Sequence, residues 1–159
     1  MKVVYGDIWE YPADYICLTT NGDVRKDGAA VMGRGVALQA KERFPGIEFA
    51  VGGEIRLHGN VLAVFDFIDW RGSTRKERRL QVFVVFPVKH HWREPADLGL
   101  IHESAMSLAE LAEEHPDKTF VLGRPGCGNG GLTWEEVRPV LESVDMPDNV
   151  HIIDRRESR

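Results

Sequence analysis

A glycine-rich segment in the N-terminal third of this 159-residue chain has the composition of an anion-binding loop. Gly33 and Gly35 bracket Arg34 at the point where a loop passes into a helical pattern. Glycine lets a ligand approach the backbone closely, and the N–H groups at a helix N-terminus attract anions. The spacing matches neither a G-x-G-x-x-G pattern nor a P-loop, so a plain turn before a helix is the alternative.

A second segment, from Gly126 to Gly131, places four glycines within six residues and also precedes a helical pattern. Thr133 and Glu136 have the spacing of a capping box, which predicts that the helix begins there. Each glycine adds to the entropic cost of ordering a loop, so a structural turn does not need four. The composition therefore favours backbone N–H groups that wrap a phosphate or a ribose.

Lys89 directly follows the apolar run 80–88, and its side chain is of a type that can take part in catalysis. An ammonium group can donate a proton or stabilise an oxygen, and a desolvated free amine can act as a nucleophile. His90 and His91 come next and could relay protons, but they match no complete metal-ligand set. The alternatives are that Lys89 is a solvated surface charge and that 90–92 is only a surface loop.

Three further side chains are of types that occur in ligand sites, but each also has a structural explanation. Asp7 could cap a turn, and Asn21 could adopt a left-handed conformation beside Gly22 without a ligand role. Cys127 could be a reactive thiol, but the sequence offers it no clear general base, which favours a packing role.

Composition excludes several classes of protein. The formal net charge of -5 argues against a nonspecific polyanion binder. The two cysteines, Cys17 and Cys127, fit no metal-ligand spacing and suggest no disulfide framework. No signal-peptide pattern and no membrane-spanning apolar run are found. We therefore expect a cytoplasmic protein without a metal ion, a cofactor or a membrane partner.

Apolar patterning predicts strands that alternate with helices. Expected strands cover 3–5, 15–20, 80–88, 119–122 and 150–153, expected helices cover 36–44, 96–114 and 134–143, and 54–57 is expected to form a hairpin with 61–68. This order predicts an α/β fold, a three-layer α/β/α domain with a mixed central sheet that spans 1–159. Ligands bind beyond the carboxyl ends of the strands in such sheets, so we expect the two glycine-rich loops at one edge.

Two polar segments lie outside these expected elements. The tail 155–159 is expected to fray, and the charged segment 71–79 is either a solvated loop or a patch that contacts a nucleic acid backbone.

Over nearly its whole length the chain resembles the macrodomains. Their opening motif corresponds to Gly6-Asp7-Ile8, and the resemblance implies that Asp7 recognises the adenine of ADP-ribose while Ile8 packs near it. Asn21 would contact the distal ribose, and the two glycine-rich loops would hold the diphosphate. The resemblance implies the following ligand-binding residues: Asp7, Ile8, Thr20, Asn21, Met32, Gly33, Arg34, Gly35, Val36, Ala37, Pro125, Gly126, Cys127, Gly128, Asn129, Gly130, Gly131 and Leu132.

Two longer segments, 31–39 and 86–93, resemble the DarG-type DNA ADP-ribosyl glycohydrolases and the terminal ADP-ribose protein glycohydrolases. In both groups a lysine at the place of Lys89 is catalytic. The terminal glycohydrolases also use an aspartate where this chain has Gly130. The DarG-like, lysine-centred arrangement is therefore the better match.

The resemblance implies an enzyme that removes mono-ADP-ribose from acidic residues of proteins or from nucleic acid by lysine-assisted hydrolysis at C1″ of the distal ribose. Its partners would be ADP-ribose and ADP-ribosylated protein or DNA, with a role in the DNA damage response. The alternatives are a non-catalytic ADP-ribose reader and an ADP-ribose 1″-phosphate phosphatase. The modest size suggests a monomer.

Overall fold

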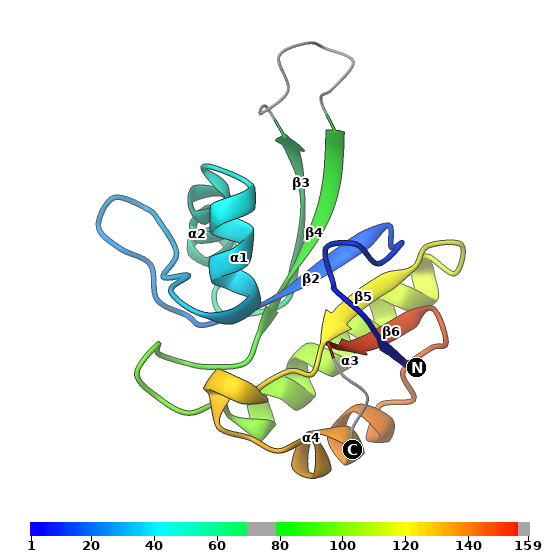
Figure 1. Cartoon of the computed structure of the whole chain (residues 1–159). Coiled ribbons are helices and arrows are strands. Elements are labelled where there is room, and N and C mark those ends of the chain that lie inside the picture. Colours follow the sequence, from blue (N-terminus) through cyan, green and yellow to red (C-terminus); the bar gives the residue numbers. More distant parts are fainter. Residues whose placement is uncertain (70–78, 156–159) are drawn as a thin grey trace.

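The computed structural model describes residues 1–69 and 79–155, and strands and helices follow one another in the order shown in Figure 1. The strands are β1 (Lys2–Tyr5), β2 (Tyr15–Thr20), β3 (Ala63–Asp69), β4 (Arg79–Pro87), β5 (Phe120–Gly123) and β6 (Val150–Asp154). The helices are α1 (Gly35–Arg43), α2 (Ile47–His58), α3 (Leu98–Glu114), α4 (Trp134–Ser143) and the short 3-10 helix η2 (Gly128–Gly130).

The strands form one mixed sheet in the order β1-β6-β5-β2-β4-β3. Every pair is parallel except β3 with β4, which is antiparallel. Thr20 pairs with Pro87, and Tyr5 pairs with Asp154, so the carboxyl ends of the parallel strands meet at one edge. This edge is where an open α/β sheet binds its ligands.

Two apolar clusters, one on each face of the sheet, produce the three layers. Leu18, Phe83 and Val85 face α1 and α2, whereas Val84 and Phe86 face α3 and α4. Alternate residues of one strand point to opposite faces, and both faces are apolar because helices cover both. Figure 1 shows α1 and α2 on one side and α3 and α4 on the other. The predicted three-layer α/β/α fold with a mixed sheet is confirmed.

The predicted hairpin between 54–57 and 61–68 is wrong. Residues 54–57 belong to helix α2, and β3 instead pairs with β4. The alternating pattern of Ile55 and Leu57 resembles a strand, but Gly52 allows the helix to pack closely on the preceding loop. A Cβ at Gly52 would lie only 1.9 Å from the carbonyl oxygen of Gly28. Tertiary packing has overridden the local pattern.

Two sequence predictions fall on parts of the chain outside the described residues. These parts are 70–78, which contain nearly all of the charged segment, and 156–159 at the C-terminal end. Within the described residues, no helix has the length and apolar character needed to cross a membrane.

Candidate functional site

A cleft opens beyond the carboxyl ends of β2, β4, β5 and β6. Three loops surround it: 21–34 before α1, 88–97 before α3, and 124–133 before α4. Figure 1 shows the three loops on the same side of the sheet. Most of the predicted site residues line the cleft: Ile8, Thr20, Asn21, Gly33, Arg34, Gly35, Val36, Ala37, Lys89, Gly126, Cys127, Gly128, Asn129, Gly130 and Gly131.

The first glycine-rich loop ends in an open helix terminus. Arg34 is the N-cap of α1, its side chain makes no capping hydrogen bond, and the first turn holds no acidic residue. The N–H groups of the first turn of a helix have no partner within the helix, and Gly35, Val36 and Ala37 line the cleft here. Such a terminus carries partial positive charge. It therefore offers an anion site where the sequence predicts one.

Asn21 holds the first loop together. Its Nδ2 donates to the carbonyl oxygen of Val31 (3.1 Å), and its Oδ1 accepts from the N–H of Asp23 (3.0 Å). Its backbone is not left-handed. The side chain lines the cleft while bracing the loop, so contact with a distal ribose stays a prediction.

The second glycine-rich loop is built differently. Gly126, Gly128 and Gly131 have φ values of 76°, 74° and 81°, which glycine adopts most readily. The N-terminus of the helix that follows is capped by side chains. Thr133 Oγ1 accepts from the N–H of Glu136 (3.2 Å), and the Glu136 carboxylate accepts from the N–H of Thr133 (3.1 Å). The predicted capping box is confirmed.

Gly130 has a packing reason for being glycine. A Cβ there would lie 2.9 Å from Cβ of Ala96, and the Gly130 carbonyl oxygen accepts from the N–H of Ala96 (2.9 Å). The second loop therefore packs against the segment that carries Lys89 into α3. An aspartate at position 130 would force these two segments apart, and the catalytic role of Lys89 stays a prediction.

Lys89 lies between the two glycine-rich loops. It is only 8% exposed, lines the cleft, and its backbone N–H donates to the carbonyl oxygen of Thr20 (3.3 Å). Asn60 Nδ2 donates to the Lys89 carbonyl oxygen (3.0 Å), so hydrogen bonds hold both the N–H and the carbonyl of this residue. Within residues 1–69 and 79–155, the Lys89 ammonium forms no ion pair or hydrogen bond. Thr20, at the same place, has a buried hydroxyl without a partner in those residues.

Four predicted ligand residues do not line the cleft: Asp7, Met32, Pro125 and Leu132. Asp7 caps a turn, because its Oδ1 accepts from the N–H of Trp9 (2.9 Å). Met32 is 2% exposed and packs in the core beneath the first loop. Ile8 does line the cleft, together with Ile153.

Sequence reasoning missed several residues that line the cleft, Arg124 and Trp134 among them. The Arg124 guanidinium lies 4.8 Å from the ring centroid of Trp134, and its Nη1 lies 3.4 Å from Oδ2 of Asp154. Its buried Nε has no partner within the described residues. Arg124 directly follows β5, Trp134 begins α4 and Asp154 ends β6, so no local motif could have identified this group.

The rim of the cleft beside Lys89 is braced by carboxylates. Asp23 accepts from the backbone N–H of Trp92 (2.7 Å) and contacts His91 Nδ1 (3.1 Å). Burial raises the pKa of Asp23, but the hydrogen bonds from Trp92 and His91 outweigh it and hold that pKa below its usual value. The hydrogen bond to Asp23 raises the pKa of His91, with a further contribution from Glu94. These contacts of Asp23 join the loop 21–34 to the loop 88–97.

The described residues offer neither an activated thiolate nor a group of side chains that could bind a metal ion. Burial raises the pKa of Cys127, which disfavours a reactive thiolate and agrees with a packing role. No group of three or more His, Cys, Asp or Glu side chains in 1–69 and 79–155 could hold a metal ion.

Comparison with known proteins points to one kind of relative. The DNA ADP-ribosyl glycohydrolase of Thermus aquaticus is 29% identical over 158 residues, which are 96% of this chain and 40% of that protein. The macrodomain of Mycobacterium tuberculosis DarG is 28% identical, covers 95% of both chains and superposes with a TM-score of 0.72. The DarTG protein of Thermosipho africanus, solved in complex with ADP-ribose, has the same TM-score at 21% identity and therefore shows only the fold.

No family model matches the chain. The chain spans 33% to 40% of the length of the curated relatives it matches. The fold is nevertheless that of a macrodomain, and the chain has DarG macrodomains as homologues.

Proposed function

We propose that this macrodomain is an ADP-ribosyl hydrolase that removes ADP-ribose from modified DNA. The observation that carries the proposal is Lys89, a buried lysine that lines the cleft between two glycine-rich loops without an ionic partner in the described residues. The similarity to DNA ADP-ribosyl glycohydrolases supports ADP-ribose as the ligand and DNA as the substrate.

The cleft gives ADP-ribose one natural orientation. Ile8 and Ile153 provide an apolar end beside β1 and β6, which suits the adenine ring. The open N-terminus of α1 suits the diphosphate, because helix termini of this kind favour anions. The distal ribose then lies beside Asn21 and Lys89, and its C1″ is the atom at which the modified DNA is attached.

Lys89 can act at C1″ in two ways. As an ammonium, it gives its proton to the leaving nucleobase as the bond from C1″ breaks; water then bonds to C1″ and returns a proton to the amine. As a free amine, its Nζ bonds to C1″ as the nucleobase leaves, and the nucleobase takes a proton from the amine. The C1″–O4″ ring bond of this glycosylamine then breaks as O4″ takes a proton from water, and water hydrolyses the resulting iminium to ADP-ribose and the free lysine. In both routes ADP-ribose and the unmodified base are the products.

The test compares Lys89→Ala with wild type on an ADP-ribosylated oligonucleotide. We expect ADP-ribose affinity to be nearly unchanged and turnover to fall by about 10²- to 10⁴-fold, the usual contribution of a positioned acid–base group. Lys26→Ala is the matched control, since Lys26 is exposed and does not line the cleft. Unchanged turnover in Lys89→Ala would contradict the proposal, and trapping with borohydride would identify the iminium route.

A panel of substrates separates the remaining functions. Release of ADP-ribose from acidic residues of a protein, but not from DNA, would redirect the proposal to protein substrates. Binding of ADP-ribose without release from any substrate would indicate a non-catalytic reader. This alternative is included because the chain has Gly130 where the terminal glycohydrolases use an aspartate. Release of phosphate from ADP-ribose 1″-phosphate would indicate a phosphatase.

A further inference from the structure

Trp92 stands out among the residues that line the cleft because its large apolar side chain stays 52% exposed. It follows Lys89 by three residues. In the proposed orientation, the part of the substrate that is not ADP-ribose leaves the cleft at this end. Trp92 is therefore placed to meet the nucleotides next to the modified one.

The backbone that carries Trp92 is fixed on both sides. Asp23 accepts from its N–H at 2.7 Å. Further along the same segment, the N–H of Asp97 donates to the carbonyl oxygen of Val88 (2.9 Å), and the Asp97 carboxylate contacts His90 Nε2 (2.7 Å). An exposed indole on a braced backbone is preorganised, so binding a partner there loses little conformational entropy.

Two arginines accompany the indole. The Arg93 guanidinium lies 4.7 Å from the ring centroid of Trp92, and Arg25 lies on the loop that Asp23 ties to this segment. Both line the cleft, and neither forms an ion pair within 1–69 and 79–155. Glu94 is the opposing charge in the same segment. Cations at this rim contrast with the net charge of -5 of the whole chain.

We propose that Trp92 stacks on a nucleobase of the DNA strand beside the modified nucleotide, while Arg25 and Arg93 contact its phosphates. The inference rests on the proposed function, since it places the strand by the position of C1″ beside Lys89. An exposed aromatic ring accompanied by arginines is the usual combination for binding single-stranded nucleic acid. Stacking tolerates any base, because each base has a π-face.

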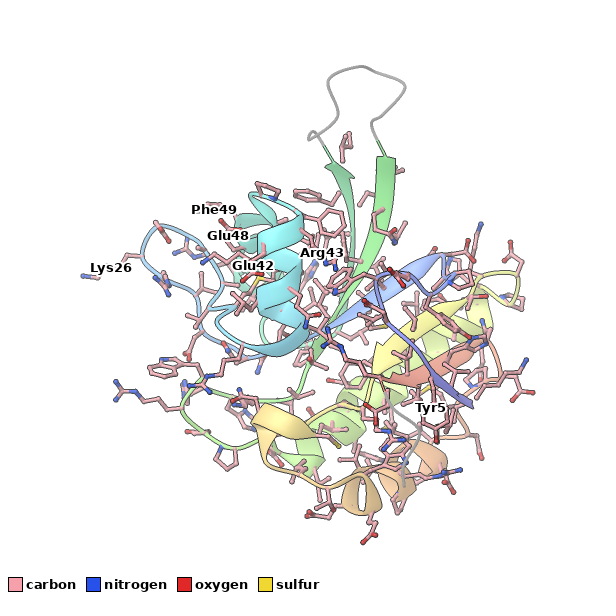
Figure 2. The ribbon with its side chains drawn as sticks, in the orientation of Figure 1. Tyr5, Lys26, Glu42, Arg43, Glu48 and Phe49 are labelled. Atoms are coloured by element: carbon pink, nitrogen blue, oxygen red, sulfur yellow. The ribbon has the colours of Figure 1, made fainter. Side chains whose placement is uncertain are left out.

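The first experiment measures binding and needs no catalysis. Fluorescence anisotropy of a labelled, unmodified single-stranded oligonucleotide compares wild type with Trp92→Ala, Trp92→Phe and Phe49→Ala. Figure 2 shows Phe49 on α2, where it is 50% exposed, and it does not line the cleft. We expect Trp92→Ala to weaken oligonucleotide binding about tenfold, Trp92→Phe to retain most of it, and Phe49→Ala to change nothing.

Salt dependence tests the arginines separately. Each phosphate contact to a single strand contributes about 0.7 to the slope of log affinity against log salt. Arg25→Ala and Arg93→Ala should each lower the slope by about that amount. Lys26→Ala should leave it unchanged, because Lys26 extends outward from the loop after β2 (Figure 2) and does not line the cleft.

A second experiment places the contact in the reaction. Trp92→Ala should raise KM about tenfold for an ADP-ribosylated oligonucleotide but not for an ADP-ribosylated mononucleoside, with ADP-ribose affinity unchanged. Equal oligonucleotide affinity for Trp92→Ala and wild type would overturn the inference, and so would an equal rise in KM for an ADP-ribosylated peptide. If wild type releases nothing from DNA, the proposed function fails while the anisotropy result still decides the role of Trp92.

Discussion

The two glycine-rich loops look alike in sequence but are built for different tasks. Gly33 and Gly35 face open space, and the helix that follows them has an uncapped terminus. Gly126 and Gly130 instead pack against neighbouring side chains, and the helix that follows them is closed by a capping box. The first loop presents N–H groups to the cleft, whereas part of the second is a scaffold that holds the Lys89 segment in place.

This difference shows what glycine content alone cannot tell. The density of glycine makes the second loop the stronger signal of a ligand site, yet close packing on Ala96 and positive φ account for much of that density. The sparser first loop offers the more open anion site. A substitution in the second loop should therefore mainly lower stability, whereas one in the first loop should mainly lower ligand affinity.

Gly126→Ala should have the largest effect on stability. Its Cβ would lie 2.7 Å from Cδ1 of Ile101 and 3.1 Å from Cβ of Ala96, at a φ of 76°. Overpacking costs about 1–3 kcal/mol and left-handed backbone about 1–2 kcal/mol, so we expect a loss of about 2–4 kcal/mol in urea unfolding. An unchanged midpoint would mean that the second loop is not packed as a scaffold.

Gly33→Ala should have the reverse signature. Its added Cβ meets no atom within 4 Å and its φ is not positive, so stability should change by less than about 0.5 kcal/mol. If the diphosphate packs against this backbone, ADP-ribose affinity measured by calorimetry should fall about tenfold, a loss of about 1.4 kcal/mol.

The control for Gly33→Ala is Gly53→Ala. Gly53 is an exposed glycine inside α2 whose Cβ would also meet no atom within 4 Å. This change should raise stability by up to about 1 kcal/mol and leave affinity unaltered. Equal affinities for both variants would show that the ligand does not approach Gly33.

Thr133→Ala tests the closed helix terminus. Losing the N-cap should lower stability by about 1 kcal/mol without altering ADP-ribose affinity, because the α4 terminus is satisfied by its own side chains. A clear loss of affinity in calorimetry would mean that the capped terminus also holds the diphosphate.

The brace at the rim should give the smallest effect, a mild pH dependence. Folding lowers the pKa of Asp23. The stabilisation that its carboxylate gives is therefore present above the pKa of unfolded Asp and is lost as the pH falls through the lower pKa of the folded protein. Folding raises the pKa of His91. The stabilisation that this histidine gives is therefore complete below the pKa of unfolded His and is lost as the pH rises through the higher pKa of the folded protein. Protection of the Trp92 amide against hydrogen exchange, corrected for intrinsic rates, should therefore peak between about pH 4 and 6.5. His91→Gln should flatten the alkaline side.

The fold could be predicted largely from the sequence because its signals are local. The apolar run Tyr15–Thr20 is a strand buried on both faces, and the capping box at Thr133 sets the start of α4. The helix α2 could not be found in this way. Its two internal glycines, Gly52 and Gly53, resemble a turn, and the close contact of Gly52 with the carbonyl oxygen of Gly28 becomes visible only in the folded chain.

The candidate site divides in the same way. Lys89 and the first loop follow from motifs, whereas Arg124, Trp134 and the bracing of Trp92 by Asp23 depend on segments that meet only in the folded chain. The extent of the domain, the cytoplasmic location, the monomeric state and the link to DNA damage stay predictions.

The central claim is that one ADP-ribose lies across both loops with its distal ribose beside Lys89. Titration of the isotope-labelled protein with ADP-ribose, followed by NMR of the backbone amides, tests it most directly. The account predicts shifts at Gly35–Ala37, at Gly126–Gly131 and at Lys89, with none at exposed Phe49 on α2. Shifts that spare the α1 terminus and Lys89 would contradict it.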